Sequence, residues 1–145
     1  MSTLLDSSDR ATILQRLRRL EPGSRPGWGT LTAGRMVCHL ADSLRVGLGD
    51  VKAKRVDTLA SRTLIKWLVV YSPVKPPPGK IQTAPEMLVS APTSWAQDLA
   101  TLEALLARTA TPSSATHPFF GPLPPDGWGR LGWKHVDHHL RQFGC

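Results

Sequence analysis

Three of the five histidines lie within five residues of one another near the carboxyl end of the chain. His135 and His139 are four residues apart, so in a helix they lie one above the other on the same face. His138 points about 100 degrees away from His139 around such a helix. Two imidazoles on a buried face need polar partners, because an unpaired buried polar group costs free energy. A divalent metal ion would partner both rings, so the spacing raises the hypothesis of a metal site.

The apolar pattern around this pair indicates that it faces the protein interior. Large apolar residues recur there at the spacing of a buried helical stripe, and the histidine pair lies along that stripe. The stripe consists of Trp128, Leu131, Val136, Leu140 and Phe143. Charged residues fall mostly on the opposite side. The alternative is a solvated helix face, on which histidines four apart are also common and bind no metal.

A third imidazole is expected from another helix, because catalytic zinc sites often have three protein ligands and a water molecule. His39 is the preferred candidate, since it lies in the middle of an expected helix beside apolar neighbours. His117 precedes a proline in an expected loop and is the second choice. Cys38 would be a soft ligand, but it lies about 100 degrees around the helix from His39. Val136 stands where zinc proteases have glutamate after the first histidine, which argues against a protease.

Other side chains have two interpretations each. Asp42 lies one turn after His39 and could orient its imidazole, or it could be an ordinary solvated charge. Gln142, three residues after His139, could orient that ring in the same way. Four aromatic residues could wall a pocket or serve only in packing. They are Trp28, Phe119, Phe120 and Trp128.

Periodicity and end signals predict four to five helices. We expect them after a cap at residues 7–9, over 32–49, over 57–71, after Thr93-Ser94, and over about 129–143. Two irregular proline-rich connections, residues 72–92 and 111–127, join them, and the first is long enough to wrap over the other helices. No strand pair stands out. The expected fold is therefore all-α: a single domain, residues 1–145, forming a helix bundle with long connections.

Two short stretches resemble each other. Gly27-Trp28-Gly29 and Gly127-Trp128-Gly129 each precede an expected helix, and His39 and His139 follow them at the same distance. Chance explains so short a match. The alternative is that each tryptophan closes the same end of the bundle, which would place His39 and His139 at similar depth on neighbouring helices.

The bulk composition excludes some functions. The chain has 18 Lys and Arg against 11 Asp and Glu, a net charge of +7, but the basic residues look scattered, which disfavours nucleic-acid binding. No apolar run is long enough for a membrane span, and the first residues lack the apolar centre of a signal peptide. We therefore expect a cytoplasmic protein with no membrane partner, in which Cys38 and Cys145 are reduced.

The pattern His135-x-x-His138-His139-x-x-Gln142 resembles the closing-helix signature of the DinB-like (YfiT-type) superfamily of four-helix-bundle metalloproteins. Trp28-Gly29, followed by Met36-x-x-His39-Leu40, is similar to the first ligand helix of that superfamily. His117-Pro118-Phe119-Phe120-Gly121 and the residues after His138 look like one uncharacterised branch of it. The resemblance covers residues 16–144.

This resemblance implies a DinB-like four-helix bundle with His39, His135 and His139 as metal ligands, His138 as a non-ligand and Gln142 near the site. Relatives include metal-dependent transferases and isomerases that use small thiols, and many are homodimers. The implied function is a metal-dependent enzyme, such as a thiol-dependent transferase or a hydrolase acting on a small electrophile. A bound water or thiol would be the nucleophile. Zinc, nickel and iron all suit three imidazoles. The alternative is a non-catalytic, stress-linked protein in which the metal only ties helices together.

Overall fold

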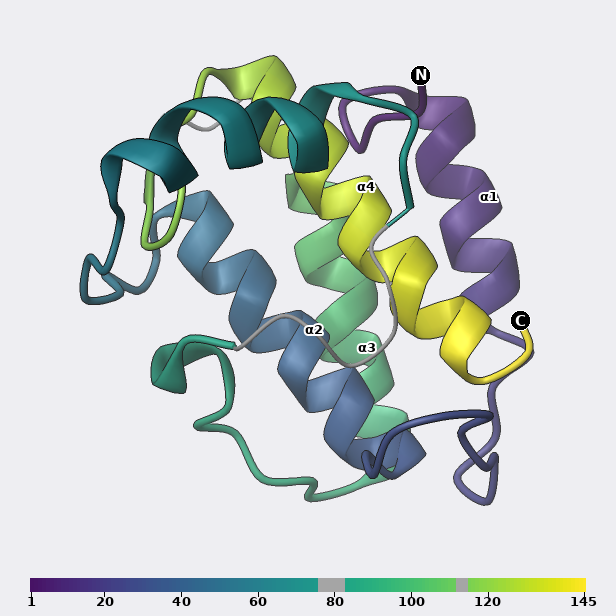
Figure 1. Ribbon diagram of the computed structural model, residues 1–145. Helices are drawn as coiled ribbons and strands as arrows, with labels where there is room; N and C mark the ends of the chain where they lie inside the picture. The colour runs from purple at the N-terminus through teal and green to yellow at the C-terminus, as the bar shows by residue number, and fades with distance from the viewer. Residues whose placement is uncertain (76–82, 112–114) are drawn as a thin grey trace.

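The computed structural model describes residues 1–75, 83–111 and 115–145. Four α-helices dominate this part of the chain (Figure 1). They are α1 (Ser7–Leu17), α2 (Ala33–Leu48), α3 (Trp95–Arg108) and α4 (Pro125–Gln142). The run Pro76-Pro77-Pro78-Gly79 of the first expected connection, and residues 112–114 of the second, lie outside the described residues.

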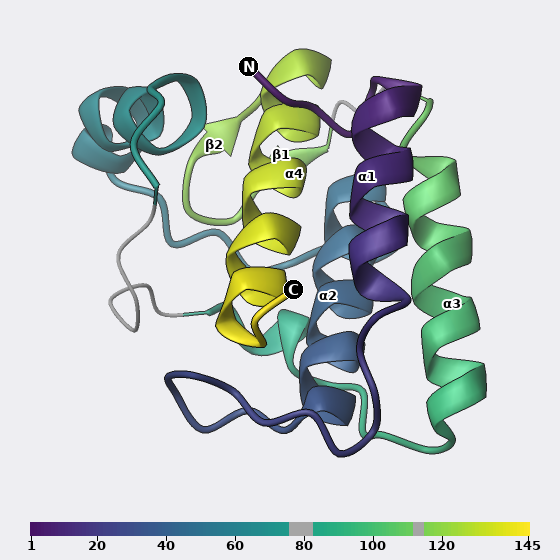
Figure 2. The same ribbon diagram turned by 90° about the vertical axis from the view of Figure 1, so that its right-hand side faces the viewer.

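The four helices form a bundle in which each packs against two others. α2 contacts α3 and α4, and α1 contacts α4 and α3 (Figures 1 and 2). Among the described residues, the main core consists of apolar side chains from these helices and from the connecting segments, with Ile13, Leu40, Leu102 and Leu140 almost fully buried. The predicted all-α helix bundle is thus confirmed.

α2 and α4 run in opposite directions. The backbone N–H of Gly27, before α2, donates to the carbonyl of Gln142 at the end of α4, at 2.7 Å. At the other end of α2, Gly47 lies under the ring of Trp128, which belongs to the first turn of α4. Trp28 and Trp128 therefore lie at opposite ends of the helix pair. The idea that both tryptophans close one end of the bundle is wrong.

The helix ends agree with the sequence in part. Thr32 caps α2 by accepting from the Arg35 N–H at 3.2 Å, and Gly49 ends the helix with φ 82°. α1 is capped by Asp6, not by residues 7–9, because its carboxylate accepts from two backbone amides. Ser94 occupies the N-cap position of α3, but its side chain makes no capping hydrogen bond. The Asp98 carboxylate instead accepts from the backbone N–H and the hydroxyl of Thr93.

α4 begins four residues earlier than the periodicity suggested. Pro125 occupies its first turn, where the missing N–H of proline costs nothing. The glycines of this helix admit the amino-terminal segment, whose Leu4 N–H donates to the Gly129 carbonyl at 2.9 Å. A Cβ at Gly132 would lie 2.8 Å from Leu4 Cδ1. Small residues here reflect close packing and do not mark the start of the helix.

The expected helix over residues 57–71 is present but wound more widely. It forms two π-helical stretches, η1 (Ser61–Ile65) and η2 (Trp67–Tyr71), and the Ser72 N–H bonds the carbonyl five residues back, on Trp67. One buried side chain of this run, Val70, packs with Phe120 and Leu123. Residue propensities predict a helix here but do not distinguish an α-helix from a π-helix.

Two short elements were not expected. A 3-10 turn, η3 (Pro85–Met87), lies in the first long connection. A hairpin pairs β1 (Thr116–His117) with β2 (Gly121–Pro122) in antiparallel register. The expectation of no strand pair is wrong at this point, because two-residue strands carry no alternating pattern. Among the described residues, no helix combines the length and apolar character needed to cross a membrane.

Candidate metal centre

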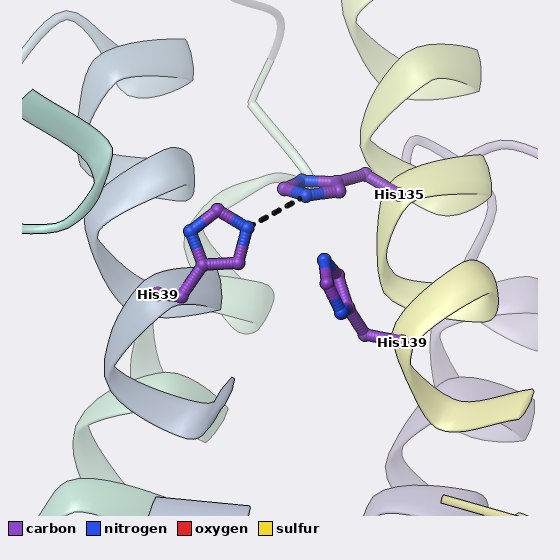
Figure 3. Close-up of side chains that lie close together, drawn as sticks. All are labelled: His39, His135 and His139. Atoms are coloured by element: carbon purple, nitrogen blue, oxygen red, sulfur yellow. Dashed lines mark hydrogen bonds between the residues drawn. The ribbon is translucent and has the colours of Figure 1, made fainter. Parts of the chain in front are cut away.

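Three imidazoles converge between α2 and α4. His39 comes from α2, and His135 and His139 come from α4, with each pair of ring centroids 4.9 Å apart. Figure 3 shows the three rings pointing toward one another across the gap between the helices. One nitrogen from each lies within 4.8 Å of the others. Among the described residues this is the one group of three or more His, Cys, Asp or Glu side chains close enough to share an ion.

The helices hold these rings by burying their neighbours. Val136 and Leu140, which flank the α4 pair, are 1% and 0% exposed, and this fixes the rotation of α4 about its axis. On α2, Met36 and Leu40 do the same for His39, which is itself 3% exposed. The histidine pair of α4 lies on one helix face as its spacing predicts, and that face points inward.

A backbone carbonyl sets the tautomer of His39. Its Nδ1 lies 2.8 Å from the carbonyl oxygen of Met87, in η3. A carbonyl only accepts hydrogen bonds, so Nδ1 carries the proton and Nε2 presents its lone pair to the other rings. This is the usual support of a metal-binding histidine.

A side-chain amide sets the tautomer of His139 in the same way. The Gln142 Nε2 donates to the Trp28 carbonyl at 2.7 Å, and this orients the amide. Its Oε1, 2.8 Å from His139 Nδ1, can then only accept the Nδ1 proton. The Nε2 of His139 is left with a free lone pair. Gln142 thus contacts the cluster directly.

The third ring completes a donor set that fits a metal ion. His135 Nε2 lies 3.0 Å from His39 Nε2. Two imidazole nitrogens on a tetrahedral zinc ion lie about 3.3 Å apart, given Zn–N bonds of about 2.0–2.1 Å. The observed separation is close to that value. Without an ion, His135 must donate a proton to His39, whereas a bound ion would accept both lone pairs.

The surroundings keep these rings neutral. Burial lowers the pKa of His39 from its ordinary value, and burial together with the His39 imidazole lowers the pKa of His139 to about 4. The pKa of His135 falls well below its usual range, first through desolvation and then through the neighbouring imidazoles, although its side chain is only partly buried. Neutral imidazole is the form that ligates metals.

Asp42 does not contact His39. Its buried carboxylate pairs with Arg45 at 2.8 Å and accepts from the backbone N–H and hydroxyl of Ser90, at 2.8 and 2.6 Å. The interpretation of Asp42 as a direct support of the His39 imidazole is wrong. It anchors to α2 the segment that carries Met87, whose carbonyl holds His39. The carbonyl contact could not be inferred from the sequence, since any residue type could supply it.

The two alternative ligands, His117 and Cys38, lie outside the cluster, and so does His138, the expected non-ligand. The Nδ1 of His117 accepts from the backbone amides of Phe119 and Phe120, both at 3.1 Å, and shapes the hairpin turn. Burial lowers the pKa of His117 to about 4. His138 packs edge-on against Trp28 with ring centroids 5.9 Å apart, and Cys38 is buried elsewhere on α2.

A cavity of about 1240 Å³ opens beside the imidazoles, and all three line it. The four aromatic residues proposed as pocket walls, Trp28, Phe119, Phe120 and Trp128, also line it. Two further wall residues, Ile65 and Val69, belong to the π-helical run and were not singled out from the sequence. Their apolar character was visible, but the packing of that run on α4 was not.

Comparison with known proteins identifies a family. The sequence profile of a family described as protein of unknown function (DUF1569) matches residues 2–144 of the chain. Neither a curated protein nor a solved structure matches it significantly. The match spans nearly the whole chain, so the chain belongs to the DUF1569 family.

Proposed function

We propose that this member of the DUF1569 family binds a divalent metal ion through the Nε2 atoms of His39 and His139 and a ring nitrogen of His135. One observation carries the proposal: the Met87 carbonyl and the Gln142 amide leave two Nε2 lone pairs free beside the third imidazole. Three neutral imidazoles suit zinc, nickel or iron. The earlier resemblance to DinB-like metalloproteins supports the same ligand set.

We further propose that the site is catalytic. No fourth His, Cys, Asp or Glu side chain among the described residues joins the cluster, which is the pattern of an ion with an open position. A divalent ion held there would supply a Lewis acid toward a small thiol or a small electrophile.

The chain itself would position the reactants. The hydrogen bonds from Nδ1 of His39 and His139 hold protons away from the site and fix both rings. The aromatic walls of the cavity would exclude water and bind the apolar part of a small substrate. A thiol-dependent transfer onto that substrate is the reaction that the DinB-like resemblance favours.

Cobalt substitution tests this function. Titrating the metal-free protein with Co²⁺ should give the visible spectrum of a bound ion in the wild type, and His39→Ala should abolish it. Adding a small thiol such as cysteine should then add a sulfur-to-cobalt band, because an open position admits the thiol. A cobalt spectrum that no thiol changes would contradict the catalytic proposal.

The second candidate function is a purely structural metal site. Its support is that the three imidazoles join α2 to α4, so an ion would cross-link two helices of the core. In that case, removing the metal should lower stability while thiols and electrophiles leave the cobalt spectrum unchanged.

A further inference from the structure

The positive charge of the chain is concentrated in one segment. Residues 52–75 contain six basic residues and one acidic residue, a net charge of +5 out of +7 for the whole chain. The basic residues are Lys52, Lys54, Arg55, Arg62, Lys66 and Lys75. Asp57 pairs with Arg55 at 2.8 Å and with Arg62 at 3.4 Å, so this single carboxylate is shared by two guanidinium groups. The interpretation that the basic residues are scattered therefore misses their main cluster.

The same segment exposes large apolar side chains. Leu59, Leu64, Trp67 and Leu68 are 80%, 72%, 60% and 44% exposed. Amides of a π-helix bond five residues back, so residues four or five apart fall on one side. The opposite side carries Val70, which is fully buried. In both ribbon views the π-helical run lies at the margin of the molecule, with its outer side facing away from the bundle (Figures 1 and 2).

We propose that residues 52–75 form a docking element for an anionic lipid surface. A short helix with Trp and Leu on its outer face and Lys and Arg around them matches the chemistry of a bilayer interface, where apolar groups insert and basic groups meet lipid phosphates. The expectation of no membrane partner rested on the lack of a spanning segment, and it did not consider surface binding.

Other occupants fit this face less well. A second copy placed symmetrically would bring two segments of charge +5 together. A nucleic acid would match the charge and could stack one base on Trp67, but the three exposed leucines of this face, Leu59, Leu64 and Leu68, offer no aromatic plane for further bases. An anionic bilayer satisfies both the charge and the aliphatic side chains.

The docking element is coupled to the cavity. Ile65 and Val69 line the cavity from the same π-helical run, and the Lys134 ammonium, next to His135, donates to the Val69 carbonyl at 2.7 Å. Docking would therefore place one wall of the cavity at the lipid surface. Leu64 and Trp67, which would contact the lipid, do not line the cavity beside the histidines. Lipid binding by this face therefore does not require a metal ion at the three-histidine cluster.

Vesicle sedimentation with the full-length protein tests the proposal. The wild type should bind vesicles of phosphatidylcholine and phosphatidylglycerol at low salt, bind less at high salt, and bind little to phosphatidylcholine alone. Leu64→Asp should reduce the partition coefficient by more than about tenfold, because it places a charge in the inserted face. Val89→Asp is the matched control, since Val89 is 70% exposed outside this segment.

A second pair of variants tests the charge alone. Lys52→Gln with Lys54→Gln should weaken binding to the anionic vesicles by more than about tenfold. Arg19→Gln with Arg25→Gln removes the same charge from exposed positions within the connection between α1 and α2 and should have little effect. Both ribbon views place that connection at the opposite end of the molecule from the π-helical run (Figures 1 and 2). Circular dichroism checks that each variant is folded, and its metal content should equal that of the wild type.

Three results would overturn the proposal. One is no binding of the folded wild type to anionic vesicles at low salt. Another is a dimer in light scattering, without vesicles, that Leu64→Asp dissociates. The third is binding to RNA with none to vesicles. None of these results bears on the metal content of the three-histidine cluster.

Discussion

At the scale of single residues, the site depends on where two protons lie. His39 and His139 each give their Nδ1 proton to an oxygen outside the cluster, from Met87 and Gln142. Gln142 is the more informative of the two supports, because its side chain can be changed by mutation while a backbone carbonyl cannot. Its amide also ties the site to Trp28, in the segment before α2.

Gln142→Leu should weaken metal binding by about 10- to 100-fold, because His139 loses the acceptor that fixes its tautomer. Competition with a chelator of known affinity measures this loss. Gln15→Leu, at an exposed position on α1, is the control. Wild-type affinity in Gln142→Leu would show that the amide does not support a ligand.

Acid should destabilise the metal-free protein. Burial lowers the folded-state pKa values of His117 and His139 to about 4, from an ordinary value of 6.5, and also lowers those of His39 and His135. Between these values the unfolded chain binds more protons than the folded chain, so stability falls as pH drops from 6.5 toward 4. Above pH 6.5 these histidines are mostly neutral in both states, so they contribute little to the pH dependence of the free energy of unfolding.

Urea unfolding of the metal-free protein at several pH values measures this effect. His117→Asn should reduce the slope between pH 6.5 and 4, since one depressed group is gone. A free energy of unfolding that stays constant over this range would contradict the assigned neutral state.

At the scale of elements, α4 carries both the site and the closest packing. Its glycines let residues 3–5 cross the helix, and its buried face sets the direction of His135 and His139. The sequence predicted the spacing and the inward face of this helix correctly. The sequence did not predict that α4 begins at Pro125. Gly127 and Gly129 disfavour a helix when the segment that packs against them is unknown, so the expected start was too late.

Gly129→Ala should destabilise the protein by about 1–3 kcal/mol, the usual cost of overpacking. An added Cβ would collide with Thr3 and lie 2.9 Å from Leu5 Cγ, and this outweighs the gain of about 1 kcal/mol in helix propensity. Gly23→Ala is the control, because nothing lies within 4 Å of that Cβ. Thermal unfolding compares the two, and equal melting temperatures would contradict the packing of residues 3–5 on α4.

At the scale of the whole molecule, a metal ion would join α2 and α4 across the bundle. The four-helix arrangement and the meeting of His39 with the carboxyl-terminal pair were predictable, because periodicity defines the helices and their apolar faces. Two features were not predictable: the hydrogen bond from His39 to the Met87 carbonyl, and the pairing of Asp42 with Ser90. Both depend on how residues 85–90 fold back onto α2. The winding and exposed face of the 57–71 helix were also beyond pattern reasoning.

Removing the metal should lower the melting temperature. An ion that binds only the folded state, present at about a thousandfold above its dissociation constant, stabilises by about 4 kcal/mol. Chelator treatment of the wild type should remove this contribution, and the same treatment should leave His139→Ala unchanged. A wild-type melting temperature that chelation does not affect would show that no ion links the helices.

The most direct measurement is the metal content of protein purified without added metal. Elemental analysis should find about one divalent ion per chain in the wild type and in His138→Ala, because one three-histidine site binds one ion. His39→Ala, His135→Ala and His139→Ala should each contain almost none. A wild type without metal, or equal losses in all four variants, would contradict the three-histidine site.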